Sequence, residues 1–118
     1  MHNFQELKIW QKSMDITVDV YKLSAQFPKE EKYGLTSQIR RSAVSIPSNI
    51  SEGAGRNTNG EFKNFLGIAS GSSNELFTQL ILSERLNLVE QQNINPILKE
   101  LIEVQKMNYK LIQKISKI

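Results

Sequence analysis

Residues 38–56, QIRRSAVSIPSNISEGAGR, place a proline inside a helical pattern, and this feature limits the fold more than any other. Proline lacks a backbone N–H and clashes with the carbonyl four residues earlier, which costs a helix interior about 3 kcal/mol or more. One helical phase nevertheless continues across Pro47, since a single face carries Leu35, Ile39, Ala43, Ile46, Ile50 and Ala54. A break would usually reset the phase, so we predict one continuous helix, kinked at Pro47. We expect Gly53 and Gly55 to end it, because glycine tolerates the left-handed conformation that closes helices.

Two further helices are predicted from apolar spacing and capping residues. The first runs from Glu6 to Ser24, and three- and four-residue steps define its apolar face: Leu7, Trp10, Met14, Thr17 and Tyr21, widened by Ile16, Val20 and Leu23. Thr58 and Glu61 match a capping box, and so mark the start of a helix of roughly 30 residues, about 45 Å long. The core stripe of this helix is Phe62, Phe65, Leu66, Ala69, Ser73, Leu76, Leu80, Ser83 and Leu86.

A run of small residues, GIASGSS at 67–73, occupies the middle of this long helix. Small side chains let another backbone approach closely, and Gly67 and Gly71 are spaced one turn apart, as in closely packed helix pairs. We therefore expect a neighbouring helix to pack closely at these two glycines.

The last helix is predicted to begin at Asn95 as N-cap with Pro96 at the first helical position. Its heptad seam is Ile97, Leu101, Val104, Asn108, Leu111, Ile115 and Ile118. A second apolar stripe beside the seam indicates contact with two neighbours at once: Leu98, Ile102, Tyr109 and Ile112. Asn108 interrupts the seam, either to specify register or oligomeric state or as an exposed or locally paired asparagine.

Four antiparallel helices with short connections predict an all-α fold, an up-and-down four-helix bundle in which residues 1–118 form one domain. The absence of cysteine excludes a disulfide framework and thiolate metal ligands. No stretch has the length of a membrane span and no secretory signal is visible, so we expect a cytoplasmic protein without a membrane partner.

The residues available for catalysis are few. His2 is the only histidine and lies at a terminus that we expect to be mobile, which argues against histidine acid–base catalysis and two-histidine metal sites. We therefore predict no catalytic residue, no metal and no cofactor.

Polar residues gather on both sides of the proline. Ser45, Asn49 and Glu52 share one helix face, and Ser72 and Glu75 share a face of the next helix. If these faces meet, the five side chains form a hydrogen-bonded network that satisfies carbonyls released by Pro47. The alternative is a ligand or catalytic pocket.

Basic residues suggest an anionic partner, since the chain carries a net charge of +3. The candidates for nucleic-acid contact are Arg40, Arg41, Arg56, Lys106, Lys110, Lys114 and Lys117. Pairing with Glu52 or Glu75 is the alternative for one of the paired arginines, and a solvated helix face is the alternative for the lysines.

Three stretches carry a family resemblance: LKIWQKSMDITVDVYKLSAQFP, YGLTSQIRRSAVSIPSNISEGAGR and EFKNFLGIASGSSNEL. The chain resembles the four-helix bundle proteins encoded by intervening sequences within bacterial 23S rRNA genes. It is similar in fold to the accessory variability protein of diversity-generating retroelements, a basic bundle that partners a reverse transcriptase and binds nucleic acid. The resemblance implies a barrel-like homopentamer and no established enzymatic activity. The residues that map onto the family motif are Arg40, Arg41, Glu52 and Gly53. The resemblance marks these positions but implies no mechanism for them.

We therefore predict a non-catalytic, ring-forming protein that binds structured RNA or acts with ribonucleoprotein. A ring of five copies would carry a net charge of about +15. RNA that binds one copy weakly would then bind the ring more tightly, because several copies contact it at once. The alternative function is an oligomeric scaffold or adaptor for a protein partner, suggested by the second apolar stripe of the last helix. A third interpretation is an enzyme with a pocket around Ser45, Asn49, Glu52 and Glu75.

Overall fold

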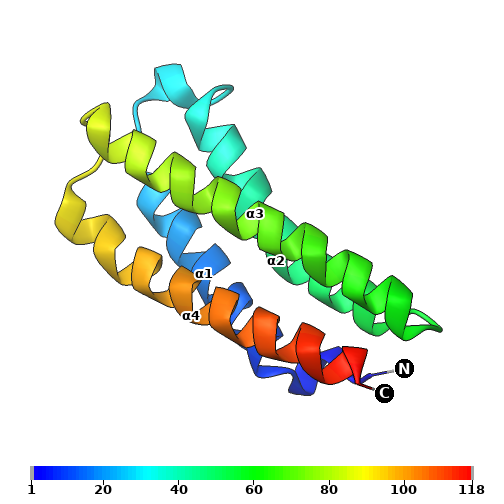
Figure 1. The fold of residues 1–118 in the computed structure, drawn as a ribbon. Coiled ribbons are helices and arrows are strands. Elements are labelled where there is room, and N and C mark those ends of the chain that lie inside the picture. The colour runs from blue at the N-terminus through cyan, green and yellow to red at the C-terminus, as the bar shows by residue number, and fades with distance from the viewer. Residues whose placement is uncertain (1, 118) are drawn as a thin grey trace.

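The computed structural model describes residues 2–117, which form an all-α four-helix bundle about 47 Å long (Figure 1). The helices are α1 (Lys8–Ser24), α2 (Leu35–Ala54), α3 (Asn59–Arg85) and α4 (Gln91–Ser116). Two short 3-10 helices, η1 (Phe4–Glu6) and η2 (Lys29–Glu31), precede α1 and α2. The predicted fold class is confirmed.

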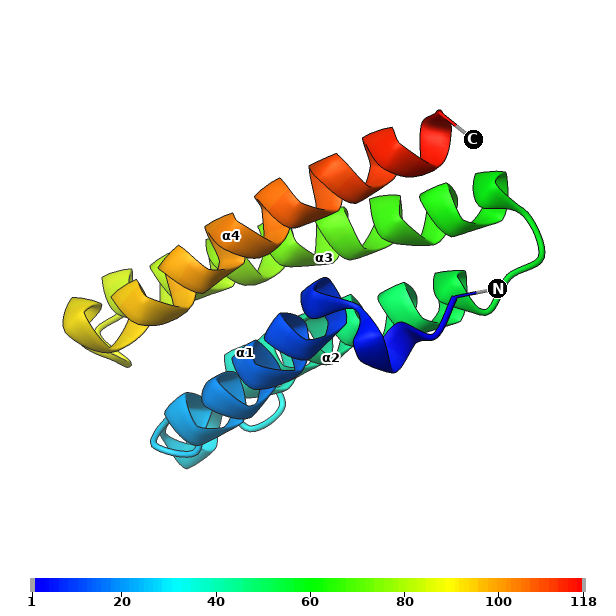
Figure 2. The ribbon, with the colours of Figure 1, turned by 90° about the horizontal axis from the view of Figure 1, so that it is seen from below.

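The four helices form two layers, α1 with α2 and α3 with α4 (Figure 2). The N-terminal segment, the α2–α3 turn and the end of α4 all lie at one end of the bundle, which we call the terminal end. The opposite end, the distal end, holds the α1–α2 and α3–α4 turns. Each layer thus exposes one seam between its two helices on the outside of the bundle.

The buried face of α1 differs from the predicted stripe. Its buried residues are Ile9, Ser13, Ile16, Val20 and Ser24. Met14 and Tyr21, which we placed in the core, are 40% and 43% exposed. The prediction is wrong because it excluded serine from the core, although buried Ser13 donates to the Trp10 carbonyl at 2.9 Å and so has its hydrogen bond.

In α2 the predicted continuity across Pro47 is confirmed, since one helix includes the proline. Pro47 removes the amide that would bond the Ala43 carbonyl four residues earlier. The structure supplies a replacement, because the Thr17 hydroxyl lies 3.1 Å from the Ala43 carbonyl oxygen and 2.8 Å from the Ser13 carbonyl oxygen. The compensation therefore comes from α1 and not from the predicted polar network.

The end of α2 is built differently from our expectation. Gly53 lies inside the helix, and Gly55 at the C-cap has a right-handed φ of −86°. A Cβ at Gly53 would lie 2.7 Å from the Phe65 Cβ and 3.0 Å from Phe62 Cδ1. Gly53 is therefore required by close packing of α2 on α3, and the predicted left-handed stop is wrong.

In α3 the capping box is confirmed: the Glu61 amide donates to Thr58 Oγ1 at 3.1 Å. The predicted close approach at Gly67 and Gly71 is absent within this chain, because a Cβ at either position would meet no atom within 4 Å. Both glycines are exposed. The close contact between α2 and α3 forms at Gly53. Leu86, predicted as the last core residue of α3, is exposed.

Helix α4 begins at Gln91, several residues before the predicted start at Asn95, and Pro96 lies inside it. The extra turn buries Ile94 against the core, which favours the earlier start. The seam prediction is confirmed for Ile97, Leu101, Val104 and Ile115, which are buried; Leu111 is half-buried, and Ile118 lies outside the described residues.

Polar contacts tie α4 to both of its neighbours. Asn108 is only 2% exposed, and its amide donates to the Leu66 carbonyl of α3 at 2.9 Å. The Lys12 amine of α1 donates a hydrogen bond to the Glu100 carboxylate of α4 and forms an ion pair with it. This hydrogen bond raises the pKa of Lys12 above its ordinary value of 10.5, and desolvation opposes the shift.

The N-terminal segment packs onto the terminal end. The His2 amide donates to the Ala54 carbonyl at 3.0 Å, and the imidazole ring lies 5.0 Å from the Phe62 ring. These contacts differ from our expectation of a mobile terminus, because His2 closes the last turn of α2. Phe4 packs edge-on against Trp10.

Candidate nucleic-acid interface

Three of the five polar residues predicted around Pro47 form one cluster between α2 and α3. The hydroxyl oxygens of Ser45 and Ser72 lie 2.8 Å apart. The Asn49 amide donates to the Ser45 carbonyl at 2.7 Å and to the Ser45 hydroxyl oxygen at 2.9 Å. All three residues are half-buried and bond one another, so the cluster connects α2 to α3.

Glu52 and Glu75 lie outside this cluster. Glu52 pairs with Arg56 at 2.9 Å, and Glu75 lies 3.6 Å from Arg41. Both carboxylates are exposed. The predicted network of five therefore reduces to three, and the two glutamates pair with candidate arginines instead.

Arg40 is half-buried and points toward α1. Its Nε donates to Ser24 Oγ at 2.8 Å and its Nη2 donates to the Tyr21 carbonyl at 3.3 Å. The guanidinium carbon lies 4.6 Å from the centre of the Tyr21 ring. Arg40 thus holds the last turn of α1 with two of its five N–H donors.

Arg41 and Arg56 are exposed but pair with neighbouring groups. Arg41 donates to Gln38 at 2.6 Å, in addition to its pairing with Glu75. Arg56 lies over the Phe65 ring, 4.8 Å from its centre, while bonding Glu52. Exposed ion pairs add little stability, yet an incoming phosphate would have to compete with these carboxylates.

The lysines of α4 have a different environment. All four side chains, Lys106, Lys110, Lys114 and Lys117, are exposed. Lys106 lies 3.8 Å from Glu103, and the other three form no ion pair with any residue of 2–117. Residues four apart on a helix are separated by about 6 Å along its axis, so these lysines form a row.

Charge is divided unevenly between the two ends of the bundle. Contacts of Ser45 with Ser72 and of Ser70 with Gln105 mark one level across α2, α3 and α4. The terminal half, residues 2–11, 45–72 and 104–117, holds seven basic and three acidic side chains. The remainder holds eight basic and nine acidic side chains. The excess of positive charge therefore lies entirely in the terminal half, which includes the lysine row.

Apolar side chains are exposed along the outer seam of each layer. The α1–α2 seam contains a recess of about 370 Å³ lined by Phe4, Trp10, Met14, Val44 and Pro47, among others. The α3–α4 seam contains a recess of about 270 Å³ lined in part by Phe77, Leu101 and Ile102. Ile102 of the second stripe of α4 is exposed at this recess, and Tyr109 of the same stripe is exposed outside it, so α4 has more apolar surface than its two neighbours cover.

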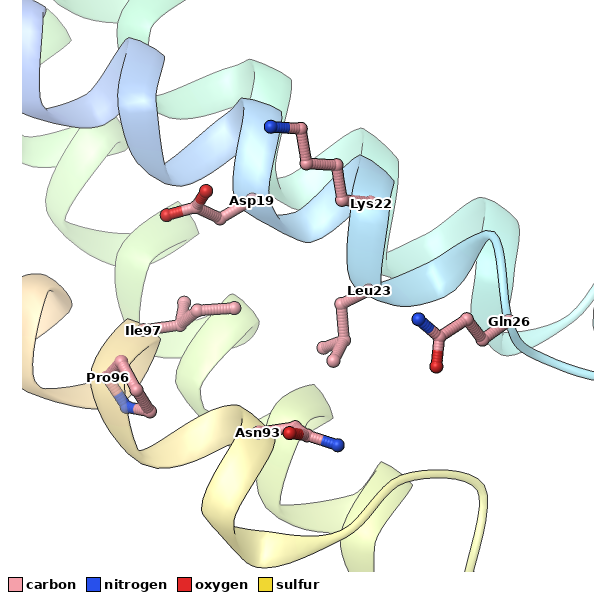
Figure 3. A pocket seen from close by; sticks show the side chains of 7 residues that line it. All are labelled: Asp19, Lys22, Leu23, Gln26, Asn93, Pro96 and Ile97. Carbon is pink, nitrogen blue, oxygen red and sulfur yellow. The ribbon is translucent and has the colours of Figure 1, made fainter.

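A polar recess of about 290 Å³ lies between the end of α1 and the start of α4 (Figure 3). Leu23 and Ile97 face each other across it, while Lys22 points its amine away from them. Its polar residues Asp19, Lys22, Gln26 and Asn93 are all exposed. Because these groups do not converge on one point, the recess is a solvated groove.

Within residues 2–117, no three acidic or histidine side chains are placed to hold a metal ion. No helix in the same range combines the length and the apolar character that a bilayer span requires.

Sequence reasoning missed several polar residues that connect the helices. Gln105 of α4 donates to Asn74 Oδ1 at 2.7 Å and to the Ser70 carbonyl at 3.2 Å. Ser42 of α2 donates to Gln79 at 2.6 Å. Their only signal in the sequence was a polar residue next to an apolar stripe, which is common on any amphipathic helix.

Comparison with known proteins decides the family. The sequence model of the 23S rRNA-intervening sequence protein family matches residues 5–110. The chain belongs to that family. The match confirms the resemblance seen in the three sequence stretches, and it covers all of α1, α2 and α3 and most of α4.

A solved structure shares the fold of this 23S rRNA-intervening sequence protein. It is a protein of unknown function from the S23 ribosomal protein family of Bacteroides thetaiotaomicron, with a TM-score of 0.79 and 26% sequence identity. The similarity covers 88% of this chain and 97% of the other. No curated protein matches the chain.

Proposed function

We propose that this protein is non-catalytic, assembles into a ring of identical copies and binds structured RNA through the lysines of its terminal half. The observation that carries the RNA proposal is the uneven charge: seven basic against three acidic side chains in the terminal half. Phosphate contacts supply most of the sequence-independent affinity of proteins for nucleic acids, so such a region suits RNA.

The lysine row suits phosphate better than the arginines do. Lys110, Lys114 and Lys117 are exposed and have no acidic partner among residues 2–117. Arg40 is engaged with α1, and Arg41 and Arg56 pair with glutamates. Of the seven candidates named from the sequence, these contacts therefore favour Lys110, Lys114 and Lys117.

The ring proposal rests on the two outer seams. Each layer of the bundle exposes apolar side chains, Met14 and Val44 on one and Ile102 on the other. Because the layers lie on opposite sides of the bundle (Figure 2), one seam of a copy can contact the other seam of the next copy. Repetition of such a head-to-tail contact closes a ring when the rotation between copies permits.

RNA binding is tested by titrating structured ribosomal RNA fragments with the protein at two ionic strengths. We expect binding at low salt that weakens steeply as salt rises, because each neutralised phosphate releases counterions. Absence of binding at low salt would refute RNA binding. Binding that does not respond to salt would refute the lysine–phosphate mechanism.

Ring formation is tested by light scattering at working concentration. We expect the wild-type protein to have the mass of several copies and Ile102→Lys to have a lower mass, since a charge would be buried in the contact. Leu86→Lys is the control, because Leu86 is equally apolar and exposed but lies at the α3–α4 turn. A monomeric wild type would contradict the ring.

A second candidate function is a scaffold for another protein, favoured by the same exposed seams. Large exposed apolar patches mark protein contacts. A monomeric mass together with capture of a protein partner in nuclease-treated extract would favour the scaffold over the ring. Partners that are recovered only with RNA would argue against it.

A further inference from the structure

Tyr109 is an aromatic side chain on α4 that the core does not use. It is 64% exposed, and it does not belong to the core cluster or to the residues packed against that cluster. Its phenol oxygen accepts a hydrogen bond from Gln113 Nε2 at 3.0 Å, which restrains the ring. The bundle therefore holds an aromatic face in solvent on a regular helix.

Three lysines of α4 lie near Tyr109 in the sequence. Lys106 lies one turn before it, and Lys110 and Lys114 continue the lysine row toward the terminal end. Asn108 bonds the Leu66 carbonyl, which places Tyr109 at the level of Gly67 on α3. A Cβ at Gly67 or Gly71 would meet no atom within 4 Å, so α3 has open space at both glycines.

We propose that Tyr109 is a stacking platform for an unpaired RNA base, and that Lys106, Lys110 and Lys114 bind the phosphates on either side. An exposed aromatic ring beside a row of cations is the arrangement that binds single strands, since any base can stack on the ring while the backbone follows the charges. A duplex cannot use the ring, because its bases already stack on one another. This inference rests on the proposed RNA binding and names the unpaired bases of a structured RNA as the part that the protein recognises.

The test measures fluorescence anisotropy of a labelled oligouridine, which is unpaired, with wild-type protein and three variants. Tyr109→Ala removes the ring, and Tyr109→Phe keeps it without the hydroxyl. Tyr33→Ala is the matched control, because Tyr33 is 88% exposed but lies in the α1–α2 turn at the distal end. A second oligomer of the same length, with abasic sites in place of uridines, keeps the phosphates and removes the stacking partner.

We expect Tyr109→Ala to bind the oligouridine roughly 5- to 150-fold more weakly than wild type, with Tyr109→Phe and Tyr33→Ala within about twofold. Wild type should lose a similar factor on the abasic oligomer, whereas Tyr109→Ala should bind both oligomers alike. Wild type should also bind the oligouridine more tightly than an RNA duplex of the same length.

Other outcomes separate this inference from the function on which it rests. If wild type binds RNA but Tyr109→Ala binds the oligouridine equally well, stacking is refuted while RNA binding stands. If wild type binds no RNA at low salt, both are refuted. If Tyr109→Ala lowers the mass by light scattering, Tyr109 belongs to the contact between copies and the stacking site is refuted.

Discussion

The replacement of one hydroxyl tests how the bundle accommodates Pro47. Thr17→Val exchanges the side-chain oxygen for a methyl group of similar size. In the native structure this hydroxyl lies 3.1 Å from the Ala43 carbonyl, which Pro47 leaves without its usual amide donor. Ala43 is completely buried, so water cannot replace the lost bond.

The expected cost follows from the isolation of that carbonyl. A buried acceptor left without a partner costs about 1–3 kcal/mol. The main expected cost of Thr17→Val is therefore the unpaired Ala43 carbonyl and not the loss of the hydroxyl as such. Urea unfolding slopes for small proteins are about 1–3 kcal/mol per molar. We therefore expect Thr17→Val to lower the urea midpoint by roughly 0.5–1.5 M at unchanged slope.

A double-mutant cycle with Pro47→Ala isolates the interaction. Alanine restores the amide at position 47, which can bond the Ala43 carbonyl within α2 and make the Thr17 hydroxyl unnecessary. We expect Thr17→Val to cost about 0.5 kcal/mol or less in the Pro47→Ala background. The coupling energy between the two sites should therefore be about 1 kcal/mol or more.

Thr78→Val serves as the matched control. Its hydroxyl also donates to the carbonyl four residues earlier, that of Asn74 at 2.9 Å, but Thr78 is exposed and no proline follows it in α3. We expect a change within about 0.5 kcal/mol. Our account of Pro47 is wrong if Thr17→Val is no more destabilising than Thr78→Val, or if it costs the same in both backgrounds.

Three further substitutions have opposite or pH-dependent effects. Gly53→Ala should destabilise the fold by roughly 1–3 kcal/mol, because the new Cβ would lie 2.7 Å from the Phe65 Cβ. Gly71→Ala should stabilise the fold by about 0.5–1 kcal/mol, because a Cβ there meets open space. Urea unfolding of the two variants measures both changes. If Gly53→Ala is also stabilising, the close α2–α3 packing is refuted. Lys12→Met should lose the pairing with Glu100. Folding raises the pKa of Lys12, so the stability difference from wild type should be largest below the ordinary pKa of 10.5 and should shrink as pH rises through the higher folded pKa. A difference that grows with pH in this range would contradict the pairing.

The parts of the fold that could be predicted depend on short-range patterns. The phase of Ile39, Ala43, Ile46 and Ile50 continues across Pro47 because these residues face one core, and the structure keeps them all buried. The capping box at Thr58 depends only on residues three positions apart, so it was visible in the sequence and forms as expected. Both patterns are complete within a single helix.

The parts that could not be predicted depend on which helix lies opposite. Thr17 reads as one more residue of an apolar face, and its role appears only when α1 is packed beside the Ala43 carbonyl. Gly53 reads as a helix stop, because nothing in the sequence shows Phe65 lying against it. The arginines illustrate the same limit for the site: only packing distinguishes Arg40, held by α1, from the exposed lysines of α4.

The salt dependence of RNA binding in matched single variants tests the central claim most directly. Lys114→Gln and Arg41→Gln each remove one exposed positive charge, the first from the lysine row and the second from a pairing with Glu75. The slope of log K against log salt is negative, and its magnitude grows with each phosphate that a lysine neutralises. We predict that Lys114→Gln reduces this magnitude by roughly 0.7 for each Lys114–phosphate contact that is lost with single-stranded RNA. Arg41→Gln should leave the slope unchanged. Equal slopes for Lys114→Gln and wild type, or a smaller slope for Arg41→Gln alone, would contradict an RNA interface at the lysines of α4.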